Sequence, residues 1–327
     1  MKDLSARSPE TVAAAEKKAA LFGDLCERVL QARQDGDYSK ESLQMSEKLV
    51  AINPEMYTVW NYRREYLEPI LEGGGEEAVE AVAHELGLTE RALMKNPKSY
   101  STFHHRKWIV SSGFCSLEHE LVLVEKLLDA DERNFHGWGY RRAISKMMGL
   151  PASRELEFSK QKIEENFSNY SAWHHRTTIL PLASHDGDDS PTALASGARV
   201  PLDTLKEEFE FVRQAFYIDP MDQSGWFYHR WLVGCVAEHL EEDNASVVQM
   251  MDEELAMCKD VHELEPDAKW PILTMVQLQK FLKIVDGRTE IDVEKNMVLL
   301  QEMDPMRMHV YADVCDGAAD PWYSLTH

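Results

Sequence analysis

One short motif recurs down this chain at nearly regular spacing, and a tandem repeat limits the possible folds more strongly than any other sequence feature. Aligned without gaps, the copies define a repeat pattern. It opens with an Asn or Asp, has an aromatic anchor seven residues later, and has an arginine three residues after the anchor. The second, third and fourth anchors are each 35 residues apart, which is the length of two helices with two turns. The five copies are NPEMYTVWNYRR (53–64), NPKSYSTFHHRK (96–107), DERNFHGWGYRR (131–142), NFSNYSAWHHRT (166–177) and DPMDQSGWFYHR (219–230), with the anchors Trp60, Phe103, Trp138, Trp173 and Trp226.

Two weaker copies follow the fifth. Residues 264–273 keep part of the pattern, and residues 303–313 keep the opening Asp304-Pro305 with Tyr311 at the anchor position. The wider gaps between copies have visible causes. Three glycines at 73–75 lengthen one loop, and a Gly/Ser/Asp/Pro-rich stretch at 184–200 is expected to form an insertion.

Each copy is interpreted as the second helix of a helical hairpin. An Asn or Asp followed by proline is typical of a helix start, where the Asn or Asp caps the helix and the proline occupies its first position. The segments before the copies, such as 39–52 and 116–130, have apolar residues at helical spacing, and no segment alternates long enough to predict a strand. The anchor and its arginine share one helix face, so we expect them to pack repeat against repeat.

These patterns predict an all-α fold. The expected architecture is a right-handed α–α superhelix (a solenoid) of about seven helical hairpins. It would occupy residues 36–327 and include the insertion at 184–200. A separate N-terminal helical segment would precede it at residues 1–35.

The composition excludes several classes of protein. The 35 basic and 57 acidic side chains give a net charge of −22, which repels phosphate backbones, so no nucleic-acid partner is expected. No apolar run approaches the roughly 18 residues of a membrane span, so no membrane insertion is expected. The N-terminal residues alternate charge with alanine and lack the apolar core of a signal peptide. Five dispersed cysteines without a C-x-x-C pair favour reduced thiols and a cytoplasmic location.

The sequence contains no complete catalytic or metal-binding motif. H-E-x-x-H, the phosphate-binding loop, the dinucleotide-binding motif and the nucleophile elbow are all absent. Cys258 and His262 are four residues apart and could supply two zinc ligands, but no second pair accompanies them. The histidine doublets at 104–105 and 174–175 point about 100° apart on a helix and cannot easily share one metal. No metal or cofactor is therefore expected in this chain.

Lys98 conflicts with its expected place in the repeat. Helix N-termini carry positive potential, which disfavours a cation in the first turn, and Lys98 and Arg133 both fall there in the alignment. A lysine at such a place is sensible if the site receives a phosphate or diphosphate. Without such a ligand, Lys98 would be an ordinary solvated lysine. Tyr100 and His136 follow in the same first turns and could line the same surface.

The repeats NPKSYSTFHHRKW, DERNFHGWGYRR, NFSNYSAWHHR and DPMDQSGWFYHRW resemble those of protein prenyltransferase alpha subunits. This family includes the subunit shared by farnesyltransferase and type I geranylgeranyltransferase, and the subunit of Rab geranylgeranyltransferase (type II). The likeness is greatest to the Rab type, through NFSNYSAWHHR and DPMDQSGWFYHRWLVG. It extends from about Asn53 to Tyr311 and is strongest up to Gly234.

The resemblance implies a division of roles between two chains. The alpha subunit would be a helical scaffold around an obligate beta subunit, which holds a zinc ion and the pocket for geranylgeranyl diphosphate. There a substrate cysteine, bound to zinc as a thiolate, attacks the first carbon of the lipid and displaces diphosphate. The cysteines belong to the C-termini of Rab GTPases, which a Rab escort protein presents on a docking surface of the alpha subunit.

The resemblance also implies site residues. The lysine of the N-P-K-x-Y motif, which reaches towards the diphosphate in the family, corresponds to Lys98, and the motif tyrosine corresponds to Tyr100. The histidine of the following repeat corresponds to His136. Farnesyl-type subunits have a tyrosine before that histidine, whereas this chain has Phe135 and lacks its hydroxyl.

Two alternative functions stay open at this point. The chain could be the alpha subunit of farnesyltransferase or type I geranylgeranyltransferase, for which no escort protein would be required. It could also be a non-catalytic helical-repeat adaptor, which would have no obligate partner. The motifs N-P-K-S-Y and D-E-R-N-F-H favour an enzyme subunit over the adaptor.

Overall fold

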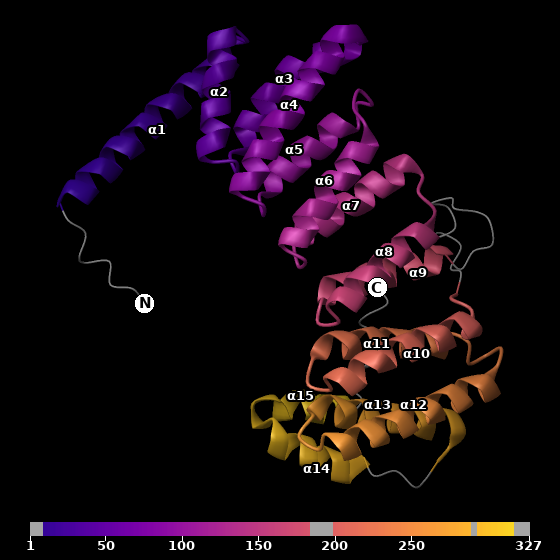
Figure 1. The fold of residues 1–327 in the computed structure, drawn as a ribbon. Coiled ribbons are helices and arrows are strands. Elements are labelled where there is room, and N and C mark those ends of the chain that lie inside the picture. Colours follow the sequence, from indigo (N-terminus) through magenta and orange to yellow (C-terminus); the bar gives the residue numbers. More distant parts are fainter. Residues whose placement is uncertain (1–8, 184–198, 289–292, 317–327) are drawn as a thin grey trace. The chain divides into compact units, whose positions relative to one another are not determined.

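The computed structural model describes residues 9–183, 199–288 and 293–316, and within these ranges the chain is helical without a strand. Helix α1 (Pro9–Asp35) is followed by seven helical hairpins, which confirms the predicted hairpin repeat (Figure 1). The insertion expected at 184–200 lies outside these ranges except for its last two positions. None of the helices in these ranges is both long enough and apolar enough to span a membrane. The chain divides into two compact units, Met1–Met148 and Gly149–His327.

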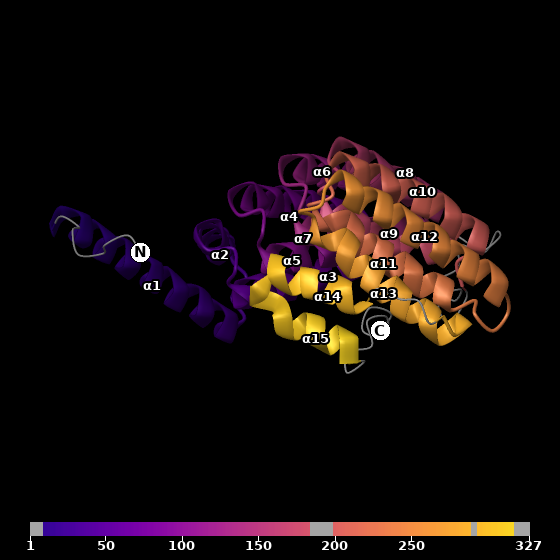
Figure 2. The ribbon, with the colours of Figure 1, turned by 90° about the horizontal axis from the view of Figure 1, so that it is seen from below.

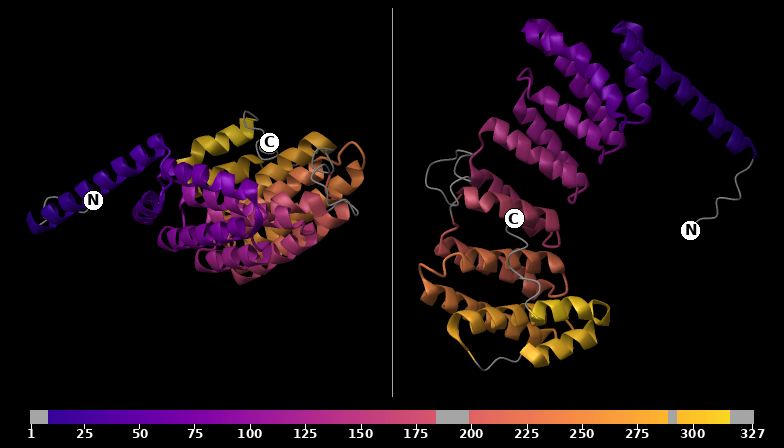
Figure 3. Two further views of the ribbon diagram at one scale, coloured as in Figure 1. Left: turned by 90° about the horizontal axis from the view of Figure 1, so that it is seen from above. Right: turned by 180° about the vertical axis from the view of Figure 1, so that it is seen from behind.

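The first unit stacks three hairpins in two layers. The first helices of the hairpins form one layer, and the second helices form the other. The first layer contains α2 (Lys40–Ile52), α4 (Gly75–Lys95) and α6 (Leu117–Ala130), and the second contains α3 (Tyr57–Gly73), α5 (Tyr100–Val110) and α7 (Phe135–Met148). The C-terminal part of helix α1 packs on this unit (Figure 3). Its residues Phe22, Leu25 and Val29 belong to the core around Trp60.

The second unit repeats this arrangement in four hairpins. In Figure 2, α8, α10 and α12 lie along one side of the unit, and α9, α11 and α13 lie along the other. The short 3-10 helix η2 (Pro305–Arg307) precedes the last helix. The bounds are α8 (Ala152–Glu165), α9 (Tyr170–Ala183), α10 (Leu202–Ile218), α11 (Gln223–Ala237), α12 (Asn244–Leu264), α13 (Lys269–Asp286), α14 (Val293–Met303) and α15 (Met308–Asp316).

The second-layer helices begin later than the sequence predicted. Asn53, Asn96 and Asp219 are the C-terminal caps of the preceding helices. Their side chains accept from the backbone N–H two residues later, at 3.1, 3.3 and 2.9 Å, which closes a local turn. Because this turn occupies the Asn or Asp side chain, the next helix starts four residues later, as at Tyr57 after Asn53. The prediction that Asn or Asp caps the second helix is therefore wrong for these repeats, although Pro305 does start η2.

The four tryptophan anchors hold the turns before their helices in place. The indole N–H groups donate to the backbone carbonyl six residues earlier, at distances of 2.8, 2.8, 2.7 and 3.1 Å for Trp60, Trp138, Trp173 and Trp226. All five anchors are at most 6% exposed, and Tyr311, at the same position of the last hairpin, is 2% exposed. The predicted packing of the anchors between hairpins is thus confirmed.

Replacing Trp173 by Ala is expected to lower the free energy of unfolding by about 3–5 kcal/mol, because it removes a buried aromatic and leaves a cavity. It also removes the donor to the Phe167 carbonyl. Urea denaturation measures the loss. Tyr170→Ala is the control, since Tyr170 starts the same helix and is 48% exposed, and its cost should stay near about 0.5–1 kcal/mol. Equal losses in the two variants would show that the anchor does not stabilise the repeat.

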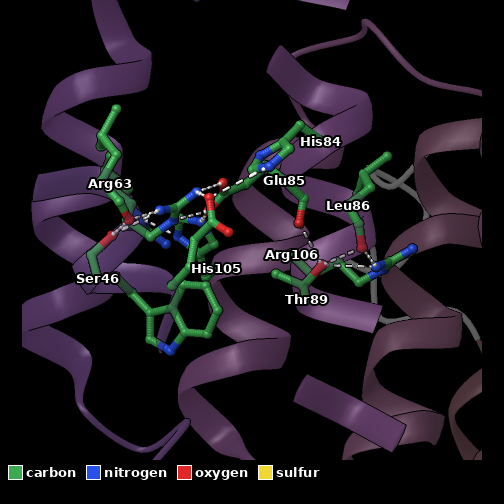
Figure 4. Close-up of polar contacts among 12 residues, drawn as sticks. Ser46, Arg63, His84, Glu85, Leu86, Thr89, His105 and Arg106 are labelled. Atoms are coloured by element: carbon green, nitrogen blue, oxygen red, sulfur yellow. Dashed lines mark hydrogen bonds and ion pairs between the residues drawn. The ribbon is translucent and has the colours of Figure 1, made fainter. Parts of the chain in front are cut away.

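A buried ladder of polar side chains joins successive hairpins. In each step of the ladder, a glutamate on a first-layer helix accepts hydrogen bonds from the arginine that lies three residues after the anchor of the previous hairpin. The same glutamate forms a hydrogen bond with the His or Tyr that lies two residues after the anchor of its own hairpin. Glu85 accepts from Arg63 at 2.8 Å, and its carboxylate lies 2.7 Å from the ring of His105 (Figure 4). The same contacts join Glu120 to Arg106 and Tyr140, and Glu208 to Arg176 and Tyr228. The arginines after three of the anchors, Arg63, Arg106 and Arg176, therefore serve packing between repeats, as the sequence predicted.

The fifth copy departs from the aligned pattern. His229, not an arginine, lies three residues after Trp226, and Arg230 follows one position later. The predicted arginine is therefore absent from this copy. The contact is nevertheless kept, because the His229 ring lies 2.9 Å from the carboxylate of Glu254, which also accepts from Arg213.

Candidate functional site

A surface groove of about 440 Å³ lies on the second-layer helices α3, α5 and α7 of the first unit. Its lining is largely aromatic. Two of the three predicted site residues, Tyr100 and His136, belong to it. The remaining lining residues are Tyr57, Ser101, Phe103, His104, Lys107, Phe135, Gly139 and Tyr140.

Tyr100 and His136 are neighbours because each lies at the start of its helix. Tyr100 is the first residue of α5, and His136 is the second residue of α7. Their ring centroids are 4.4 Å apart in an edge-to-face contact, and the Phe103 ring stacks on His136 at 5.7 Å. The structure thus brings these two predicted residues together, while Tyr100 stays 65% exposed and open to a ligand.

Asn134 fixes this geometry, although the sequence analysis did not single it out. Its side-chain oxygen accepts from the backbone N–H groups of His136 and Gly137, both at 3.1 Å, which starts α7. Its side-chain nitrogen donates to the Pro97 carbonyl at 2.7 Å, which ties the turn before α7 to the turn before α5. The signal was present in the sequence. Polar capping residues recur four positions before four of the five anchors, at Ser99, Asn134, Asn169 and Asp222.

The surroundings of His136 favour its neutral form. Burial lowers the pKa of its imidazole, and the positive charge of Lys98 lowers it further, while Glu55 raises it. A neutral imidazole can donate one hydrogen bond without adding charge.

Lys98 lies in the turn before α5 rather than in the first turn of a helix. The predicted conflict with the helix N-terminus is therefore weaker than the sequence indicated. Lys98 pairs with Asp131 of the next turn at 3.2 Å, and its side chain is 67% exposed. Exposed pairs of this kind contribute about 0–1 kcal/mol, so a stronger anion can displace Asp131 at little cost.

Phe135 lines the groove with a ring that carries no hydroxyl. The residue starts α7 and is 63% exposed, and its ring meets His136 edge-on at 5.7 Å. It offers an apolar surface where a tyrosine would offer a donor. The predicted polar groups are then Tyr100 and His136 in the groove and Lys98 in the turn before α5, which could together suit an anion.

Metal ligands do not gather in the part of the chain that the structure describes. No group of three or more His, Cys, Asp or Glu side chains there could hold a metal ion. Cys258, one half of the candidate pair with His262, is fully buried, and burial raises the pKa of its thiol well above the usual value. That thiol would be costly to ionise, which a zinc ligand requires.

Known proteins contain the same kind of repeat as this chain. The model of the protein prenyltransferase alpha subunit repeat matches residues 39–68, 82–113, 117–148, 152–182 and 205–236. The chain is 36% identical over 284 residues to the geranylgeranyl transferase type-2 subunit alpha of Dictyostelium discoideum, which covers 86% of each chain. It is 41% identical over 226 residues to the Rattus norvegicus subunit and 51% identical over 232 residues to subunit alpha 1 of Arabidopsis thaliana. These matches cover 68% and 70% of this chain but only 39% and 33% of those two relatives.

A solved structure supports the same fold. Candida albicans protein geranylgeranyltransferase-I complexed with GGPP contains a chain that matches with a TM-score of 0.66. The match covers 90% of this chain and 89% of that chain at 21% identity, so it shows the fold alone. With the five matched repeats and the relation to the Dictyostelium subunit over most of both chains, this chain belongs to the protein prenyltransferase alpha subunit family, in its geranylgeranyl transferase type-2 branch.

Proposed function

We propose that this chain is the alpha subunit of a heterodimeric protein geranylgeranyltransferase and is inactive without a beta subunit. The pair transfers geranylgeranyl from its diphosphate to the C-terminal cysteines of Rab GTPases that an escort protein presents. The observation that carries this proposal is the 36% identity to the Dictyostelium type-2 subunit over 86% of both chains. A relation of that extent covers most of the chain and not one motif alone.

The groove on α3, α5 and α7, together with Lys98 in the turn before α5, offers groups that this role could use. A zinc ion held by the beta subunit would supply the substrate thiolate. In this chain, Lys98 places a positive charge near the diphosphate, and Tyr100 and His136 offer neutral donors beside it. Their contacts accelerate transfer only if they strengthen as negative charge builds on the departing diphosphate.

The cysteines support a cytoplasmic location for the enzyme. The four cysteines in the described ranges are free thiols, and two of them, Cys235 and Cys258, are buried. Free thiols persist in a reducing compartment such as the cytoplasm.

Reconstitution tests the proposed function. The chain is produced alone and together with a type-2 beta subunit, and transfer of labelled geranylgeranyl to a Rab GTPase is measured with and without escort protein. We expect a stable heterodimer, transfer that requires the escort, and no transfer by either chain alone. Efficient modification of a C-a-a-X peptide without escort would assign the chain to the farnesyl/type I branch. Failure to bind any prenyltransferase beta subunit would leave the adaptor function instead.

A further inference from the structure

Two contacts of different kinds join the turn before α5, which carries Lys98, to the turn before α7. One is the exposed ion pair between the Lys98 ammonium and the Asp131 carboxylate, 3.2 Å apart. The other is the hydrogen bond that the side-chain amide of Asn134 donates to the Pro97 carbonyl at 2.7 Å. Pro97 directly precedes Lys98 in the chain. The second contact therefore holds the backbone from which the ammonium extends.

An incoming anion affects these two contacts differently. A diphosphate competes with Asp131 for the Lys98 ammonium, because both are anions and the ion pair is exposed. The amide of Asn134 is uncharged and the residue is only 1% exposed, so the anion does not compete for its bond to the Pro97 carbonyl. When Lys98 exchanges Asp131 for the diphosphate, Asn134 thus continues to hold the turn that carries it.

The same amide group also sets the position of His136. Its oxygen accepts from the backbone N–H groups of His136 and Gly137, both at 3.1 Å. The backbone N–H of Asn134 donates to the Asp131 carbonyl at 3.0 Å, which closes the turn before α7. One buried side chain therefore connects the backbone at His136, through its oxygen, with the backbone next to Lys98, through its nitrogen.

Starting a helix does not by itself require an asparagine at this position. Ser99 and Asp222 occupy it in the second and fifth copies, where their side-chain oxygens accept from backbone N–H groups at 3.2 and 2.8 Å. Neither side chain has an amide donor, yet α5 and α11 begin there. The acceptor function of Asn134 is thus shared among the copies, and its donated bond needs a separate explanation.

Asn169, in the fourth copy, shows that the amide donor is not used in the same way at every asparagine. Its side-chain oxygen accepts from the Ala172 N–H at 3.2 Å, as expected of a cap. Its side-chain nitrogen is buried and has no hydrogen-bond partner within the described ranges. At Asn134 the donor is used, and the turn that it holds carries Lys98.

We propose that Asn134 is a positioning residue for geranylgeranyl transfer, which acts by holding Lys98 and His136 in a fixed relation while diphosphate departs. The inference rests on the proposed function and deepens it by adding a buried residue that acts through Lys98. Without the amide donor, the turn at Pro97 is released and the ammonium leaves the place where negative charge builds up. A displacement of about 1 Å in such a contact lowers a rate by up to about 100-fold.

Replacing Asn134 by Asp tests the donor alone. The carboxylate keeps the acceptor contacts that start α7, as Asp222 does for α11, but it has no donor and repels the Pro97 carbonyl. The heterodimer is assayed by single-turnover transfer at saturating lipid to a Rab GTPase presented by the escort protein. We expect the rate to fall about 10-fold or more. The KM for the Rab–escort complex should stay near the wild-type value, since the lost contact strengthens only in the transition state.

A second variant and a control accompany this substitution. Asn134→Gly removes the donor without adding charge and still suits a helix cap, so it should lose rate to a similar extent. Asn169→Asp introduces a carboxylate at the same buried position of the fourth copy, where no donated bond is lost, and should transfer at close to the wild-type rate. Circular dichroism and urea denaturation check that each variant is folded.

A double-mutant cycle with Lys98→Ala distinguishes positioning from a purely structural role. Once the ammonium is absent, Asn134→Asp should change the rate little, because the two residues act as a unit. An equal loss of rate with and without Lys98 would overturn the inference, as would wild-type transfer by the Asn134 variants, and both results leave the proposed function intact. A Lys98→Ala complex as fast as wild type would overturn it too, since no charge would remain to be positioned. A wild-type chain that forms no complex with a beta subunit would refute the proposed function itself.

Discussion

Replacing Glu85 by Ala is expected to lower the free energy of unfolding by about 3–5 kcal/mol, because removing one partner of a buried ion pair leaves an uncompensated charge. Arg63, which Glu85 binds, is 2% exposed, and His105 on the same carboxylate is fully buried. Burial would raise the pKa of the Glu85 carboxyl, but Arg63 and His105 lower it to about 2, so the group is charged in the folded protein at neutral pH. Urea denaturation at neutral pH measures the effect.

Two control variants show whether the loss comes from the unpaired charge. Glu80→Ala removes an exposed carboxylate from the same helix and should change stability by about 0.5 kcal/mol or less. Replacing the pair together, as Arg63→Met/Glu85→Leu, should restore much of the loss, since apolar residues of similar volume often substitute for a buried pair. A small loss for Glu85→Ala, comparable to that of Glu80→Ala, would mean that the ladder does not hold the hairpins together.

Replacing Lys98 by Ala is expected to lower the rate of geranylgeranyl transfer by roughly 10- to 1,000-fold, in line with the loss of one electrostatic stabiliser of a departing anion. The fold and assembly should persist, because Lys98 is 67% exposed in its pair with Asp131. Single-turnover transfer by the assembled complex at saturating lipid isolates the chemical step. Lys98→Arg should recover part of the rate, since the charge is kept but its position changes.

Asp131→Ala is the matched control for this site. It breaks the same ion pair but keeps the ammonium of Lys98. If Lys98 acts on the diphosphate, the Asp131 variant should transfer at close to the wild-type rate while Lys98→Ala is slow. A Lys98→Ala complex that assembles and transfers at the wild-type rate would make Lys98 an ordinary surface lysine.

The hairpin repeat could be read from the sequence because its information is local. The anchors recur at fixed spacing, and the same few residues decide the helix face, the turn and the indole hydrogen bond in each copy. Helix starts were less predictable. The Asn or Asp that opens each motif can cap a helix or close a turn, and the geometry of the chain around it decides which it does, as Asn96 shows before α5.

The candidate site was predictable only in part. The family resemblance selected Tyr100 and His136, and the structure places their rings in contact. The recurring cap to which Asn134 belongs was visible in the sequence, but its contact with the Pro97 carbonyl, 37 residues away in sequence, was not.

The sequence by itself determined the helical repeat, the buried anchors and the family of this protein, because each of these rests on residues close together in the chain. Only the tertiary structure decided which glutamate meets which arginine. Those partners are separated by 22 residues at Glu85, 14 at Glu120 and 32 at Glu208, so no fixed spacing encodes them. Loops of different length bring them together when the hairpins stack. The cost of leaving a buried charge unpaired then makes those contacts specific.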